Sequence, residues 1–279
     1  MRREIKYGRE SKRKKGIIDV SSTLGRIYTM EEIIAEGDEG IAKLQSLAVR
    51  PDLVYIDESE IAYAPAVTNP GKIICVGLNY INHAEESKMQ VPTTPILFSK
   101  FNNALAAHQE EIQLPEDAEK FDYEAELVIV IGKTARNVSE EDALSYVYGY
   151  SAGNDLSARD LQFRTGQWLL GKTCDQFAPV GPYIVTSDEA GDVNNLHIVC
   201  KVNGELRQTA NTKDMIFSCA AIISYASRYM TLEPGDIIYS GTPDGVILGY
   251  PEDRQQWLKS GDEITVSIQN VGTLTNVLK

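Results

Sequence analysis

The sequence has few of the residues that hold soft metals or cross-link a secreted chain. It contains three histidines and four cysteines in 279 residues. The cysteines are far apart, and neither a CxxC pair nor a neighbouring histidine completes a zinc motif; they are Cys75, Cys174, Cys200 and Cys219. This usage is typical of a reducing compartment, so we expect free thiols and a cytoplasmic protein.

Long apolar runs and an overall positive charge are also missing. No run approaches the roughly 18 residues of a membrane span. The net charge of −13 argues against a nucleic-acid surface. Residues 1–15 are the exception, with eight Lys or Arg against two Glu. No apolar segment of a targeting signal follows them, and we expect a hairpin over residues 5–20 with lysines on its exposed edge.

The order of patterns predicts a β-rich α+β protein. A capping box at Thr29–Glu32 predicts a helix reaching about Val49, interrupted by glycines. The Pro- and Gly-containing stretch 64–71 is a plausible junction, and we place a small N-terminal α+β domain at 1–67 and a larger domain at 68–279. Strands are expected at 72–78, 122–132, 146–155, 182–188, 196–204, 236–241 and 263–272, and helices at 139–147, 157–163 and 214–230.

GQWLLGKT, residues 166–173, matches the phosphate-loop pattern. Such a loop needs small residues that let backbone N–H groups curl around phosphates, after a buried strand. Here the four intervening residues are bulky and the preceding stretch is polar and helix-like. We therefore expect no nucleotide at this motif.

Gly149–Gly153 matches GxSxG, the nucleophile elbow of α/β-hydrolases. That fold needs a histidine after the serine, and the only one available is His197, in the middle of an alternating strand pattern. An oxyanion segment of the HGGG type is missing as well. A serine hydrolase is therefore disfavoured.

Asp122–Glu126 and the strand after it carry carboxylates with a distinctive spacing. Residues i and i+2 of a strand point to one face, so Glu124 and Glu126 lie together with Cβ atoms roughly 6–7 Å apart. The apolar run LVIVI follows, and Asp155 ends a neighbouring strand. Three carboxylates without His or Cys suit Mg²⁺, Mn²⁺ or Ca²⁺. The residues alone leave open the alternative that both glutamates decorate a wet sheet face.

His83 stands three residues before Glu86. On a helical turn the carboxylate can orient the imidazole and stabilise its charged form, which suits a general base. A single histidine on a surface turn often has no function. We interpret His108 and His197 as structural.

These segments resemble the fumarylacetoacetate hydrolase family over about residues 66–279. The resemblance rests on six ordered blocks: KIICVGLNYINHAEES, DYEAELVIVIGK, GYSAGNDLSARDLQ, QWLLGKTCDQFAPVGP, VNGELRQTANTKDMIF and MTLEPGDIIYSGTPDGV. It implies a mixed β-roll or sandwich behind a small N-terminal domain, and a homodimer. It also implies Mg²⁺ or Mn²⁺, with Ca²⁺ as a further option, held by Glu124, Glu126 and Asp155.

The resemblance also implies the roles of other residues. His83 and Glu86 match a lid segment whose imidazole activates water, and Lys172 would supply positive charge to a substrate carboxylate or oxyanion. Pocket residues implied by position are Arg159, Gln162, Gly241 and Thr242. Some positions depart from the family pattern, which leaves the substrate open: Lys100 is not followed by proline, and His108, Asp244 and Ile247 stand where small residues are common.

The predicted function is therefore metal-dependent hydrolysis of a C–C bond in a small β-diketo or α-keto acid of the acylpyruvate type. The first alternative is decarboxylation of an oxaloacetate-type acid or enol–keto isomerisation on the same fold. The second is a metal-binding regulatory scaffold without turnover. Partners other than the small keto acid and a second copy of the chain, such as nucleic acid or membrane, are not expected.

Overall fold

The computed structural model describes residues 16–51 and 53–279. The predicted hairpin over residues 5–20 falls mostly outside them. Its described end, β1 (Ile17–Ile18), pairs antiparallel with β2 (Tyr55–Ile56). Within the described ranges no helix is long and apolar enough to cross a membrane.

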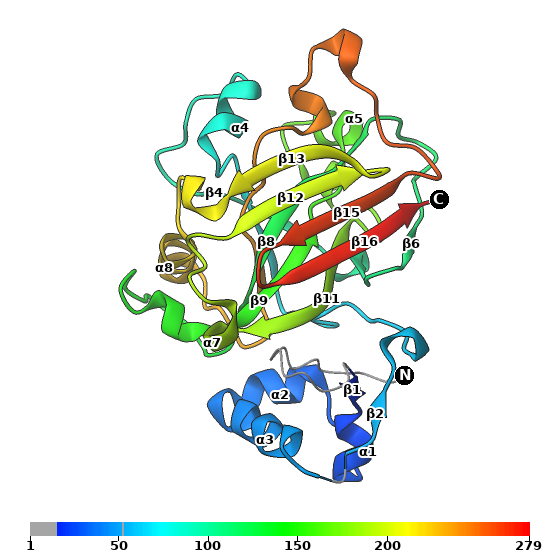
Figure 1. Ribbon diagram of the computed structural model, residues 1–279. Helices are drawn as coiled ribbons and strands as arrows, with labels where there is room; N and C mark the ends of the chain where they lie inside the picture. Colours follow the sequence, from blue (N-terminus) through cyan, green and yellow to red (C-terminus); the bar gives the residue numbers. More distant parts are fainter. Residues whose placement is uncertain (1–15, 52) are drawn as a thin grey trace.

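Residues 16–51 and 53–56 form a small, mostly helical region below the sheets in Figure 1. Its helices are α1 (Val20–Leu24), α2 (Met30–Glu36) and α3 (Asp38–Ala48). The capping box is confirmed: the Thr29 side chain accepts from Glu32 N, and the Glu32 side chain accepts from Thr29 N. Gly37, at φ 55°, separates α2 from α3, as the glycine interruption indicated. The sequence patterns missed α1.

Two larger sheets form most of the rest of the described chain. The larger has the strand order β4 (Ile96–Lys100), β3 (Ile73–Gly77), β14 (Ile237–Tyr239), β8 (Ala125–Ile131), β9 (Val147–Asn154), β11 (Ala178–Thr186), β5 (Leu105–Ala106). The smaller has the order β13 (Glu205–Asn211), β12 (His197–Val202), β15 (Glu263–Ile268), β16 (Gly272–Leu278), β6 (Glu111–Ile112). A short pair joins β7 (Phe121–Asp122) to β10 (Ser157–Ala158). The mixed, β-rich α+β fold is confirmed.

The helices of this part are short apart from one. They are α4 (Ile81–Glu86), α5 (Arg159–Gln162), α6 (Leu169–Lys172), α7 (Ser187–Ala190) and α8 (Cys219–Tyr229). The helix predicted at 214–230 begins later than expected because Ser218 is its N-cap, with its side chain accepting from Ala221 N. The helix predicted at 139–147 is reduced to a 3-10 turn at Ala143–Tyr146.

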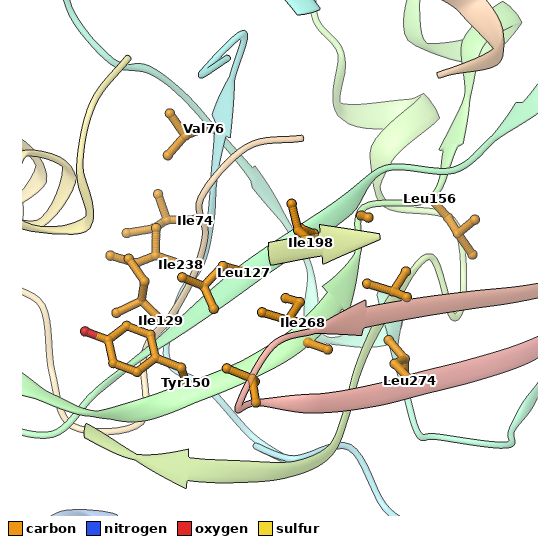
Figure 2. Close-up of a cluster of buried hydrophobic side chains, with 14 of the residues drawn as sticks. Ile74, Val76, Leu127, Ile129, Tyr150, Leu156, Ile198, Ile238, Ile268 and Leu274 are labelled. Carbon is orange, nitrogen blue, oxygen red and sulfur yellow. The ribbon is translucent and has the colours of Figure 1, made fainter. Parts of the chain in front are cut away.

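Strand β8 explains why LVIVI is apolar throughout. Leu127, Ile129 and Ile131 point into the core between the two sheets, shown in part in Figure 2. Val128 and Val130 point to the opposite face, which the N-terminal helices cover. Both faces of the strand are therefore dry, and a strand buried on both faces reads as a continuous apolar run.

Contacts across the junction fix the N-terminal region on that outer face. Ala66 N–H donates to Val180 O at 3.1 Å, and Lys133 pairs with Asp38 at 3.1 Å. The Thr68 hydroxyl also donates to Glu31. The domain boundary at 67/68 stays a prediction.

Candidate active site

The three predicted carboxylates meet at one end of β8. Glu124 and Glu126 share a face because they are two residues apart along an extended chain. Asp155 follows β9, and its N–H donates to Glu124 O at 2.9 Å, which aligns the two strand ends. One carboxylate oxygen from each residue lies within 4.8 Å of the others, and all three side chains are buried. The wet-face alternative is wrong, because both glutamates are at most 5% exposed.

Two of these carboxylates already contact buried cations. Lys172 Nζ lies 2.7 Å from Glu124 Oε2 and 3.0 Å from Asp155 Oδ2. Lys100 Nζ lies 2.5 Å from Asp155 Oδ1, and it also donates to Leu156 O and Phe177 O. Such pairs offset the cost of burying charge.

Glu126 is in a different situation. The Gly241 N–H donates to its Oε2 at 2.7 Å, and no cationic side chain of the described residues forms an ion pair with it. Burial raises the pKa of Glu126, and the neighbouring charges of Asp155 and Glu124 raise it further. Burial would also raise the pKa of Glu124, but Lys172 and Arg159 outweigh it and hold that pKa below its ordinary value. A further cation beside Glu126 would stabilise its ionised form and lower its pKa.

A hard divalent cation fits this set of donors. The oxygens are carboxylates only, which is what Mg²⁺ and Mn²⁺ prefer, and all three residues are buried. Glu126, which has no ion-pair partner, is also the carboxylate whose raised pKa favours the protonated form. A bound cation would take the place of that proton. The chemistry of the donors therefore agrees with the predicted metal.

The predicted dyad is formed on α4. His83 Nδ1 lies 2.8 Å from Glu86 Oε1, as the three-residue spacing on a helix predicts. Glu86 Oε2 in turn accepts from Gly245 N at 3.0 Å. His83 lines the cavity together with Glu124 and Glu126, and its contact with Glu86 uses Nδ1 and not the other ring nitrogen, Nε2.

Arg159 and Gln162 lie together on α5. Arg159 Nη2 contacts Glu124 Oε1 at 2.7 Å and Asp122 Oδ2 at 2.9 Å. Its Nη1 donates to Gln162 Oε1 at 2.9 Å, which leaves the Gln162 amide N–H groups available as donors. Burial opposes the charge of Arg159, but Asp122 and Glu124 raise its pKa above the ordinary value.

Gly241 and Thr242 are pocket residues implied by the family resemblance. In the structure the Gly241 N–H donates to Glu126, and the Thr242 hydroxyl accepts from Gln208 Nε2 at 2.9 Å. Thr242 lines the cavity. The contacts of both residues are thus with the protein, and their substrate-binding roles remain predictions.

A cavity of about 580 Å³ opens above the carboxylates. Its floor is ionic, and one wall is aromatic: the Phe98 and Trp168 rings meet edge to face with centroids 5.4 Å apart. Gly77 allows this arrangement, since a Cβ there would lie 2.9 Å from Trp168 Cζ3. Met89 and Phe163, each about half exposed, form an apolar rim.

The two misleading motifs have ordinary structural roles. The GKT segment ends α6, and its lysine contacts carboxylates. Gly171 is a glycine because a Cβ there would overlap Ala158 O and Gln162 N, whereas Gly166 faces open space. Ser151 is buried in the middle of β9 and donates to Tyr183 O at 2.9 Å. His197 lies on an exposed strand position, with Nε2 3.0 Å from the Thr209 hydroxyl.

Sequence patterns assigned no role to two buried residues of the site, Asp122 and Lys100. Asp122 stands two residues before Glu124, so the alternation that pairs Glu124 with Glu126 could have included it. Lys100 ends the strand FSK with no local sign of its partner, because Asp155 is 55 residues further along the chain. Its pairing depends on the tertiary fold.

Comparison with known proteins agrees with the fold. The family model described as fumarylacetoacetate (FAA) hydrolase C-terminal matches residues 72–279. A fumarylacetoacetate hydrolase domain-containing protein 2 homolog from Dictyostelium discoideum is 51% identical over 77% of this chain and 73% of its own length. The bovine protein named oxaloacetate tautomerase FAHD2B, mitochondrial, is 41% identical over 96% of this chain and 86% of its own.

Solved structures give the same result. A fumarylacetoacetate hydrolase from Exiguobacterium antarcticum superposes with a TM-score of 0.84, at 34% identity over 99% of this chain and 98% of that one. A fumarylpyruvate hydrolase from Pseudomonas aeruginosa, in complex with Mn²⁺ and pyruvate, has a TM-score of 0.69 at 31% identity over 79% and 92%. A 2-hydroxyhepta-2,4-diene-1,7-dioate isomerase from Mycobacterium marinum has a TM-score of 0.66 at 38% identity over 77% and 76%.

Proposed function

The chain belongs to the fumarylacetoacetate hydrolase family, and on that premise we propose that it is a divalent-metal-dependent keto–enol tautomerase of a small keto acid of the oxaloacetate type. This is the isomerase alternative of the sequence analysis, now preferred to C–C bond hydrolysis. Relatives about 40% identical over most of the chain are named oxaloacetate tautomerases, which supports this choice.

The observation that carries the proposal is the closeness of a base to an anion site. His83, Glu124, Glu126, Arg159 and Lys172 all line one cavity. A keto acid there would have its carboxylate and keto oxygens near cations and its C3 carbon near an imidazole. Tautomerisation needs a proton removed at one end of a C–C–O unit and returned at the other, and it needs no attacking water.

Each residue has a part in this reaction. A bound divalent metal would supply an electrophile that stabilises the negative charge developing on the keto oxygen. His83 Nε2 takes the proton from C3, and the C–H electron pair becomes the C2–C3 double bond. Glu86 steadies the imidazolium through its contact with Nδ1. The proton then reaches O2, and the reverse sequence returns the keto form.

Two side chains would hold the substrate. Lys172 uses two N–H groups on Glu124 and Asp155, and its third can donate to an anionic oxygen. Gln162 has its amide oxygen turned to Arg159, so it presents donors to a carboxylate or keto oxygen. The glutamates and Asp155 would hold the metal.

The proposal is tested by following the decay of the enol form of oxaloacetate. We expect the protein with Mg²⁺ or Mn²⁺ to accelerate the decay above buffer, and chelator-treated protein to lose the acceleration. A metal-loaded, folded protein that leaves the decay rate at the buffer value would contradict the proposal. That result would favour the alternative of a metal-binding regulatory scaffold without turnover.

Hydrolysis of an acylpyruvate-type acid is the second candidate. The cavity is much larger than a four-carbon keto acid, and Met89 and Phe163 give it an apolar rim that could contact a longer acyl group. The His83–Glu86 dyad could activate water instead of removing a proton. A panel of acylpyruvates, measured beside oxaloacetate decarboxylation, separates these reactions by product.

Assembly and location are also part of the proposal. We keep the homodimer as a prediction that light scattering can check. The four free cysteines fit a reducing compartment such as cytoplasm. Several relatives carry the word mitochondrial in their names, which makes the mitochondrial matrix the alternative location. Imaging of the tagged full-length chain would distinguish the two.

A further inference from the structure

Asp122 occupies a buried position between the two halves of the site. Its side chain is fully buried, and it lies outside the cavity lining. Its Oδ1 accepts from the N–H groups of Tyr123 and Ile247, and its Oδ2 accepts from Arg159 and from Leu248 N–H. It therefore cannot touch the substrate, but it can fix the groups that do.

On one side, Asp122 holds the guanidinium of Arg159, which lines the cavity. Arg159 Nε donates to Asp122 Oδ2 at 2.9 Å, and Arg159 Nη2 lies 2.9 Å from the same oxygen. Arg159 Nη2 also contacts Glu124 Oε1 at 2.7 Å. Arg159 is thus clamped between Asp122 and a predicted metal ligand.

On the other side, Asp122 holds the loop that carries the dyad. Its Oδ1 accepts from Ile247 N at 2.8 Å, and its Oδ2 accepts from Leu248 N at 3.1 Å. The same loop donates Gly245 N to Glu86 Oε2 at 3.0 Å. Gly249 lies so close to Glu86 that a Cβ there would overlap its carboxylate.

We propose that Asp122 is a positioning residue that fixes the His83–Glu86 dyad relative to Arg159 and Glu124 through the backbone of residues 245–249. When one Asp122 oxygen is replaced by an amide NH2 group, either the Ile247 or the Leu248 N–H loses its acceptor, so the loop relaxes and no longer fixes Glu86. The imidazole then samples orientations that do not face C3. The inference rests on the proposed function for its kinetic readout, but its structural readout does not depend on turnover.

The central variant is Asp122→Asn, which keeps the size but turns an acceptor into a donor facing N–H groups. We expect kcat for oxaloacetate tautomerisation to fall about tenfold or more, with KM changed less, because a small misplacement of a catalytic group is costly. Hydrogen–deuterium exchange should speed up in residues 244–250 and also in α4, residues 81–86.

The matched control is Asp236, which is also buried but lies outside the cavity lining. Its carboxylate accepts from Lys72 Nζ at 2.7 Å and from Glu233 N at 2.8 Å. Asp236→Asn should alter neither peptide.

A double-mutant cycle with Glu86→Gln separates positioning from a merely structural role. If Asp122 acts through Glu86, the effect of Asp122→Asn on kcat should shrink in the Glu86→Gln background. An equal effect in both backgrounds, or unchanged exchange of residues 81–86, overturns the inference. Failure of the wild-type protein to turn over oxaloacetate would instead count against the proposed function, while the exchange experiment still tests the coupling.

A milder variant covers the case in which Asp122→Asn does not fold. The Tyr123 hydroxyl donates to Gly245 O at 2.8 Å, on the same loop. Tyr123→Phe removes that bond and should also speed exchange in residues 244–250 and 81–86. Unchanged exchange of both peptides in a folded Tyr123→Phe protein would overturn the coupling through the loop.

Discussion

Lys172 Nζ lies 2.7 Å from Glu124 Oε2, so the lysine of the phosphate-loop pattern pairs with a predicted metal ligand. Burial opposes the charge of this lysine, but Asp155 and Glu124 outweigh it and raise its pKa above the ordinary value. The side chain is therefore a permanent cation at the cavity floor. Several consequences of this arrangement can be measured.

Replacing Glu126 by glutamine should weaken metal binding. The variant removes a carboxylate ligand while keeping the shape and the oxygen that accepts from Gly241 N–H. We expect the affinity for Mn²⁺ in calorimetric titration to fall about 100-fold or more, since even supporting groups around a metal are worth 10–100-fold. Glu85→Gln, on an exposed position of α4, is the control. Equal Mn²⁺ affinity in wild type and Glu126→Gln would remove Glu126 from the metal site.

Replacing His83 by alanine should abolish proton transfer and spare the metal. General-base catalysis contributes about 10²–10⁴-fold, and we expect kcat to fall within that range. Mn²⁺ affinity should change little, because His83 is not among the clustered carboxylates. His197→Ala, on an exposed strand, should keep full activity. Full turnover by His83→Ala would mean that another group acts as the base.

The stability of metal-free protein should depend on pH through Glu126. Burial raises its folded pKa above the unfolded value of about 4.3, so its contribution to stability is present below that value. The contribution is lost as pH rises through the raised folded pKa. We therefore expect the melting temperature of chelator-treated protein to decrease on the alkaline side of that range, and saturating Mn²⁺ to reverse the decrease. In Glu126→Gln the pH dependence should be smaller, and an identical profile would contradict the assignment.

Two glycine-to-alanine variants should behave oppositely. In Gly249→Ala the new Cβ overlaps the Glu86 carboxylate, so the dyad must move, and we expect kcat to fall about tenfold. In Gly166→Ala the Cβ meets open space, and activity should stay at the wild-type value, although a phosphate loop would not tolerate the change. Steady-state kinetics of both variants checks this. Loss of activity in Gly166→Ala would reopen the phosphate-loop interpretation.

Local pattern predicted the parts of the site that follow from local geometry. Strand alternation predicted that Glu124 and Glu126 share one face, and helical spacing predicted that the Glu86 carboxylate contacts the His83 ring. What it could not predict are contacts between distant segments. Lys100 reaches Asp155, and Asp122 reaches the backbone of Ile247, only after the sheets have assembled.

The same division holds for the fold. The continuous apolar run in β8 predicted a buried strand, because no face of it can tolerate water. The start of α8 was misplaced by five residues because its pattern is apolar on both sides of Ser218. Short helices such as α5 and α6 carry four residues each, too few for periodicity to define.

The buried charges set an order for the kinetic cycle. Around the floor stand four carboxylates (Asp122, Glu124, Glu126 and Asp155) and three cations (Lys100, Arg159 and Lys172). With all ionised the sum is −1. Without metal, the raised pKa of Glu126 favours its neutral form and a sum of 0, whereas a bound divalent ion with Glu126 ionised brings the sum to +1, which attracts an anionic acid. Association should therefore be sequential, with the metal entering first and the keto acid second, and initial-rate kinetics varied in both should show that the metal lowers the KM for the acid.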